Sequence, residues 1–123
     1  MSTVVDTVDP AQISISERAH GVLERLKEAG HFSEMRDIYR FGIAYALAQN
    51  VRPKRADGPR RNLYSISTLD PDGALRFAIE HLYPLEGESA YRIAERLADW
   101  GVVEIGAAFE ERFQTIADLL PDV

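Results

Sequence analysis

Two hydrophobic periodicities follow one another at the start of the chain. Residues 11–16 alternate apolar and polar side chains, which predicts a short β-strand. From Glu17 the apolar residues recur at steps of three or four, which predicts a helix that Ser16 caps and Gly30 ends. The strand's apolar face carries Ile13 and Ile15, and its polar face carries Gln12, Ser14 and Ser16.

A second helix is predicted over residues 33–50, with Ser33 at its N-cap. This segment is nearly free of charge after Arg40 and is apolar on most of its circumference. Such a helix has to be buried on several sides, and a lone strand leaves both of its edges unpaired. We therefore expect a homodimer in which two copies share these elements. The predicted dimer interface consists of Ile13, Ile15, Ile38, Phe41 and Tyr45.

An alternative partner for the strand lies within the same chain. Residues 63–68 also alternate, although weakly, and fit either a second strand or an extended connector. Pairing of residues 11–16 with this segment would make a folded monomer.

The rest of the chain predicts a basic linker followed by helices. Residues 51–62 hold two prolines, a glycine and five basic residues against one acid, as is typical of an exposed linker. Three helices follow: one that Asp70 caps and Pro84 ends, one from Ser89 to Gly101, and one from Val102 to Pro121. The last carries Val102, Ile105, Phe109, Phe113, Ile116 and Leu120 at steps of three or four.

The predicted fold is mainly α, with a strand and two helices followed by about three C-terminal helices. Residues 1–10 are expected to form a flexible arm, and residues 11–123 a single domain with parts at 11–50, 51–62 and 63–123.

Composition narrows the classes of function. The chain carries 14 Lys and Arg against 20 Asp and Glu, a net charge of −6 that repels phosphate, and it has no cysteine. The three histidines lack metal-ligand spacing, and no phosphate-binding glycine loop or nucleophile motif is present. No apolar stretch reaches the roughly 20 residues of a membrane span. We expect a cytoplasmic protein that is not an enzyme, with no catalytic residues, cofactor or metal and no membrane association.

The order of elements in residues 11–50 resembles the ribbon-helix-helix family. In that family two chains pair their strands into an antiparallel ribbon whose outward side chains read the major groove of DNA. The resemblance implies that Gln12, Ser14 and Ser16 face the groove and that the N–H groups after Ser33 meet a phosphate. No Arg or Lys lies on the strand, so dimerisation is favoured over DNA reading as the use of the ribbon.

A second resemblance concerns the run from His31 to Ala44, the segment from Leu69 to Gly73 and the Trp100-Gly101 junction. Together they resemble small bacterial proteins associated with DNA phosphorothioation gene clusters and other phage-defence loci. This resemblance implies an accessory or DNA-associated role.

Two functions are therefore considered. The first is a non-catalytic dimeric regulator bound to duplex DNA, or an accessory subunit of a larger DNA-modification or defence complex. The basic residues of the linker would neutralise phosphates of the DNA backbone. Alternatively, they only keep an exposed connector soluble. These residues are Arg52, Lys54, Arg55, Arg60 and Arg61. The alternative is an assembly module that docks a basic partner without nucleic acid. Its acidic helical surface would comprise Glu80, Glu86, Glu88, Glu95, Asp99, Glu104, Glu110 and Glu111.

Overall fold

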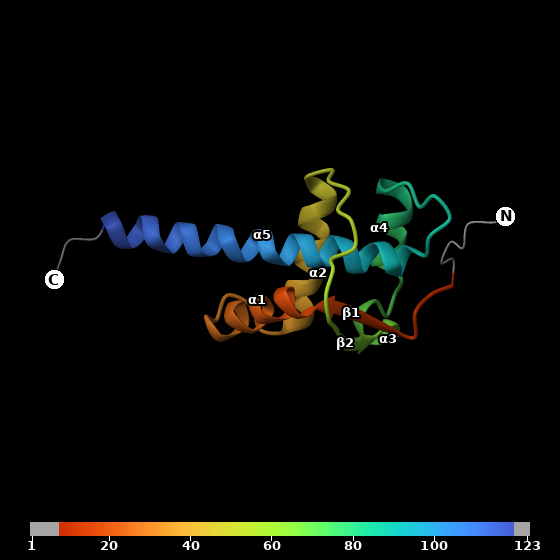
Figure 1. The fold of residues 1–123 in the computed structure, drawn as a ribbon, viewed down its shortest axis with the longest axis horizontal. Helices are drawn as coiled ribbons and strands as arrows, with labels where there is room; N and C mark the ends of the chain where they lie inside the picture. Colours follow the sequence, from red (N-terminus) through yellow and green to blue (C-terminus); the bar gives the residue numbers. More distant parts are fainter. Residues whose placement is uncertain (1–7, 120–123) are drawn as a thin grey trace.

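A computed structural model of the chain describes residues 8–119, with side chains described as far as residue 111. The C-terminal helix runs along the long axis of the molecule, a second helix crosses it, and a small sheet lies at one side (Figure 1). In chain order they are β1 (Gln12–Ser16), α1 (Glu17–Glu28), α2 (Met35–Ala48), β2 (Arg60–Ser65), α3 (Ile66–Leu69), α4 (Ala74–Leu82) and α5 (Ala90–Leu119).

The first strand and helix form where the sequence predicts them. The Ser16 hydroxyl accepts a hydrogen bond from the Ala19 N–H at 3.2 Å, and Gly30 has a φ of 81° just after α1. The start of α2 differs from the prediction, because Glu34 is the N-cap residue and no side chain caps this helix. The N-cap assigned to Ser33 is therefore wrong, and Ser33 is an exposed residue of the preceding turn.

The partner of β1 is a segment of the same chain. β1 and β2 form a two-stranded antiparallel sheet, with Gln12 opposite Ser65 and Ser16 opposite Arg60. The register shifts by one residue between Ile13 and Ser14, which makes a β-bulge on β2. The predicted ribbon between two copies is wrong, and the in-chain pairing left open by the sequence is found, with the second strand beginning earlier, at residue 60.

The last two predicted helices are one continuous helix. α5 has 30 residues and therefore a length of about 45 Å, and Gly101 lies in its interior instead of ending a helix. The reason is a crossing with α2: a Cβ added at Gly101 would collide with the Gly42 backbone carbonyl. Glycine at position 101 lets the two backbones touch.

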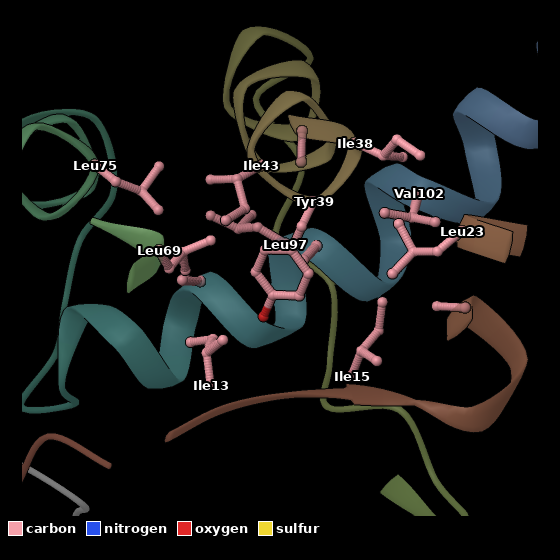
Figure 2. Close-up of a cluster of buried hydrophobic side chains, with 14 of the residues drawn as sticks. Ile13, Ile15, Leu23, Ile38, Tyr39, Ile43, Leu69, Leu75, Leu97 and Val102 are labelled. Carbon is pink, nitrogen blue, oxygen red and sulfur yellow. The ribbon is translucent and has the colours of Figure 1, made fainter. Parts of the chain in front are cut away.

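The hydrophobic core lies between β1, α1, α2 and α5 (Figure 2). Ile13, Ile15 and Ile38 are fully buried in it, so their assignment to a dimer interface is wrong. α5 covers the apolar side of α2 within one chain, which removes the argument that α2 needs a second copy. The fold is thus a set of helices packed around a small antiparallel sheet, and the ribbon-helix-helix arrangement is absent from residues 8–119.

The segment before α4 shows how a buried acid holds a helix start. The Asp70 carboxylate accepts hydrogen bonds from the N–H groups of Leu75 at 2.9 Å and Arg76 at 3.0 Å, and from the Tyr91 hydroxyl at 2.8 Å. Burial opposes its ionisation, but these hydrogen bonds outweigh burial and hold the pKa of Asp70 below its usual value. α4 itself begins after Gly73, which has a φ of 72°.

The predicted N-terminal arm lies largely outside the described residues, since the structure begins at residue 8. Asp9 accepts a hydrogen bond from the Ser89 hydroxyl at 2.7 Å and pairs with Arg76 at 3.3 Å. Within the described part of the chain, no helix has the length and apolar character needed to span a membrane.

Candidate interaction surfaces

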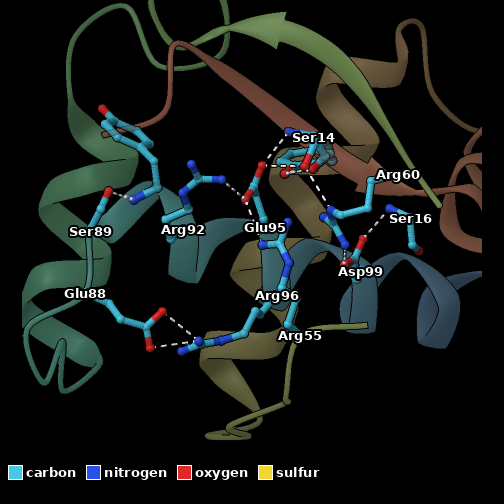
Figure 3. Close-up of polar contacts among 12 residues, drawn as sticks. Ser14, Ser16, Arg55, Arg60, Glu88, Ser89, Arg92, Glu95, Arg96 and Asp99 are labelled. Atoms are coloured by element: carbon cyan, nitrogen blue, oxygen red, sulfur yellow. Dashed lines mark hydrogen bonds and ion pairs between the residues drawn. The ribbon is translucent and has the colours of Figure 1, made fainter. Parts of the chain in front are cut away.

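The outer edge of β1 is occupied by two carboxylates of α5 (Figure 3). The Ser14 N–H donates to Glu95 Oε2 at 2.7 Å, and the Ser16 N–H donates to Asp99 Oδ1 at 2.8 Å. Alternate N–H groups of a strand are about 6.6 Å apart, and helix residues four apart differ by about 6 Å in height. Glu95 and Asp99 therefore match the spacing of the strand edge and take the place of a neighbouring strand.

A tyrosine completes the same edge. The Tyr39 hydroxyl donates to the Ser14 carbonyl at 2.9 Å from inside the core. Burial, together with the negative charge of Glu95 and Asp99, raises the pKa of Tyr39 well above its usual value. The hydroxyl thus stays protonated and remains a donor to the strand.

The predicted role of Ser14 and Ser16 in contacting a DNA groove is wrong, because both lie at this covered edge. Ser14 and Ser16 are 7% and 6% exposed, and the Ser14 hydroxyl donates to Glu95 Oε2 at 2.5 Å. Neither serine can face a DNA groove, and only Gln12 of the three predicted groove-facing residues is exposed.

Two of the predicted phosphate-binding arginines serve the same carboxylates. Arg60 donates from Nη1 to Asp99 Oδ2 at 2.8 Å and from Nε to the Ser14 hydroxyl at 3.0 Å. Arg55 reaches Glu95 Oε1 at 3.4 Å. Burial of two carboxylates is costly without positive charge beside them, and these arginines supply it.

The other linker bases lie elsewhere. Arg61 pairs with Glu17 at 3.1 Å, the Arg52 guanidinium lies 5.6 Å from the centre of the Tyr83 ring, and Lys54 is exposed. Ser33 is exposed, and the next residue, Glu34, pairs with Arg36 at 3.1 Å and not with a linker residue. The predicted set therefore does not form one site.

The predicted acidic surface is smaller than expected, because Glu95 and Asp99 are 1% and 5% exposed. A sequence signal for this exists but was missed: both acids lie four residues apart among apolar neighbours such as Ala94 and Ala98. Five of the predicted acids remain exposed: Glu80, Glu86, Glu104, Glu110 and Glu111.

An aromatic collar surrounds the point at which α5 leaves the body of the protein. It consists of His31, Phe32, Phe41, Tyr45 and Phe109. The His31 ring stacks on Phe109 at 4.4 Å, and Phe32 lies 5.7 Å from Phe41 and 6.3 Å from Phe109. Phe41 is 50% exposed, so the collar has an open face.

Two hollows lie on either side of Phe109 in this collar. One, of 370 Å³, has Val22, Leu26 and Phe109 among its lining residues. The other, of 190 Å³, is lined by Phe41, Tyr45, Ile105, Ala108 and Phe109. Beyond them α5 runs on to Leu119, past the ends of α1 and α2 (Figure 1). Phe113, Ile116 and Leu120 of the predicted apolar stripe lie outside the residues whose side chains are described.

An arginine cluster on the opposite half of α5 was not found from the sequence. Arg92 and Arg96 lie one helical turn apart and face Arg55 of the linker across a hollow of 350 Å³ that Glu88 completes (Figure 3). Arg96 Nη1 contacts both Glu88 carboxylate oxygens, at 2.7 and 2.8 Å. Arg92 and Arg96 are four residues apart in the sequence, and this spacing predicts that they lie on one face of a helix.

The described side chains contain no group of three or more His, Cys, Asp or Glu that could hold a metal ion. Comparisons with protein-family models, curated proteins and solved structures find no match to the chain.

Proposed function

We propose that this protein is a non-catalytic assembly module that joins two copies of itself through the aromatic collar and the projecting end of α5. The observation that carries the proposal is the open collar, with Phe41 half-exposed, at the point where α5 continues beyond the body. Apolar surface left in water costs about 25 cal/mol per Å², so a cover for the exposed rings of the collar is favoured.

A second copy suits this surface because the arrangement is self-complementary. The helix runs ten residues from Phe109 to Leu119, about 15 Å. If two such ends lie antiparallel about a twofold axis, each tip reaches the collar of the other copy. The same patch is then buried on both partners.

The edge of the collar is charged. Arg25, in the last turn of α1, pairs with Glu110 of the same chain at 3.8 Å, and the two side chains are 63% and 69% exposed. This pair gives the apolar patch a polar rim, as is typical of protein interfaces.

Sedimentation velocity at micromolar concentration tests the proposal. We expect the wild-type chain to sediment as a dimer and the variant Phe41→Asp as a monomer with an unchanged circular dichroism spectrum. Phe77→Asp is the matched control, since Phe77 is 64% exposed on α4 and lies outside the collar, and this variant should remain dimeric. A monomeric wild type, or equal dimerisation of both variants, would overturn the proposal.

The DNA-associated role expected from the two resemblances stays a prediction. Titration of a labelled DNA duplex into the full chain tests it.

A further inference from the structure

We propose that the arginine cluster binds the phosphate group of a small phosphorylated molecule. The site lies on the half of α5 away from the collar, so the inference is independent of dimerisation. It joins two hollows that share Arg55 and Arg92.

The second hollow extends the cluster toward the sheet. It has a volume of 470 Å³, and its lining residues include the polar side chains of Gln12, Asn62 and Arg60. Gln12 and Asn62 are both exposed, so their amide groups are accessible from solvent. The site would thus offer neutral hydrogen-bond donors beside its guanidinium groups.

Each carboxylate of the cluster has an arginine partner. Glu88 pairs with Arg96, Asp99 pairs with Arg60 at 2.8 Å, and Glu95 lies near both Arg55 and Arg92. Guanidinium groups therefore gather at one place in a chain whose net charge is −6.

Arg55 is the residue best placed to bind an anion. Its Nη1 lies 3.4 Å from Glu95 Oε1, at the long end of the hydrogen-bond range, and Arg92 lies 3.5 Å from that same oxygen. The other Glu95 oxygen is taken by Ser14. The Arg55 side chain is 47% exposed, and among the described side chains, as far as residue 111, it makes no other hydrogen bond or ion pair.

The chemistry of guanidinium groups points to phosphate as the anion. Arginine presents a planar fork of N–H groups that matches two phosphate oxygens at once, and several arginines around one hollow can share a dianion. Arg96 Nε and Arg60 Nη2 are buried without a hydrogen-bond partner, so the cluster also holds donors that its own carboxylates leave unsatisfied.

A small phosphorylated molecule fits better than a nucleic-acid backbone. The arginines line hollows between the linker, β1 and α5. The backbone of a duplex is instead bound by basic side chains on an accessible face. The net charge of −6 repels a polyanion over its whole length but opposes a single phosphate group much less. The shared chemistry is the phosphate oxygen, and the experiment separates the two sources.

Binding is measured on the full chain with three probes at constant ionic strength. Inorganic phosphate and glycerol 3-phosphate are titrated by isothermal calorimetry, with acetate as the reference anion. A labelled DNA duplex is titrated by fluorescence anisotropy. We expect both phosphate probes to bind more tightly than acetate, and the duplex to bind weakly.

The variant Arg55→Gln should weaken phosphate binding by about tenfold, the loss expected for one charge-assisted hydrogen-bonding group. Arg61→Gln is the matched control: Arg61 is 50% exposed, lies in the same basic segment and has one carboxylate partner, Glu17, outside both hollows. It should bind phosphate like the wild type. Backbone amide NMR of the wild type should also show phosphate-dependent shifts around residues 55 and 92.

Three results would overturn the inference. One is phosphate binding no tighter than acetate, and another is an equal effect of Arg55→Gln and Arg61→Gln. The third is tight duplex binding that Arg55→Gln abolishes without binding of the small phosphate probes, which would assign the cluster to a nucleic-acid backbone instead.

Discussion

The edge of β1 and the aromatic collar differ in whether their exposed groups find partners within the chain. At the edge, the N–H groups of Ser14 and Ser16 and the Ser14 carbonyl all have partners from α5 and α2. At the collar, apolar rings such as Phe41 remain partly in water. An isolated strand edge looks like the part of the molecule that needs a second copy, yet side chains satisfy it within the chain. The uncovered surface is the apolar one.

The same two helices build both regions. α2 supplies Tyr39 to the strand edge and Phe41 to the collar, and α5 supplies Glu95 to the edge and Phe109 to the collar. Substitutions can therefore separate the contributions of the edge, of the crossing that joins the two helices, and of a second buried carboxylate, Asp70.

The largest effect is expected at the edge. Glu95→Ala leaves the Ser14 N–H without a partner and removes the negative charge beside Arg55, so the free energy of unfolding should fall by about 3–5 kcal/mol. Urea denaturation at fixed protein concentration measures this. Glu104→Ala, an exposed acid of the same helix, is the control and should change stability by less than about 0.5 kcal/mol. Comparable losses for the two variants would contradict the capping role.

The helix crossing should show the next largest effect. Gly101→Ala places a Cβ against the Gly42 carbonyl, and because backbone cannot rotate away, the loss of stability should be about 3 kcal/mol. At Gly106 the obstructing atom is a side-chain methyl of Val22, so Gly106→Ala should cost less. A Cβ at Gly21 on α1 would meet only the Arg25 guanidinium, at an ordinary contact distance of 3.9 Å, so Gly21→Ala should be neutral or stabilising. Thermal unfolding would rank the three, and any other order would contradict the contact.

Local signals predicted several elements correctly. The Ser16 cap, the left-handed Gly30 and the stop before Pro84 act within a few residues, so the sequence showed them directly. The helix end predicted at Gly101 was wrong, because the contact that requires glycine there is with Gly42, 59 residues earlier. No local pattern distinguishes a helix end from a close crossing of two helices.

The candidate sites were harder to predict for the same reason. Arg55 and Arg60 were identified as linker bases, but their partners Glu95 and Asp99 come from a helix about 40 residues later. A charge run in a linker indicates exposure on average. It does not show which bases fold back onto buried acids.

The smallest effect is expected at Asp70, which stabilises a helix start as Glu95 stabilises a strand edge. Its pKa is lowered in the folded protein, so its contribution is present above the unfolded value of about 4 and is lost as the pH falls through the folded value. Asp70→Asn should therefore cost about 1 kcal/mol at pH 7, and the difference from the wild type should shrink below about pH 4. Urea midpoints across this range measure it. A difference that stays constant with pH would show that the charge of Asp70 is unimportant.

The contact between Gly42 and Gly101 limits which substitutions this protein can accept as its sequence evolves. The atom that obstructs a larger residue at position 101 is a main-chain oxygen, which every amino acid at position 42 would also possess. No replacement at position 42 can make room, so a second-site change there cannot rescue a substitution at 101. Only a wider separation of the two helices would do so, and that would displace Tyr39 from the strand and Phe41 from the collar together.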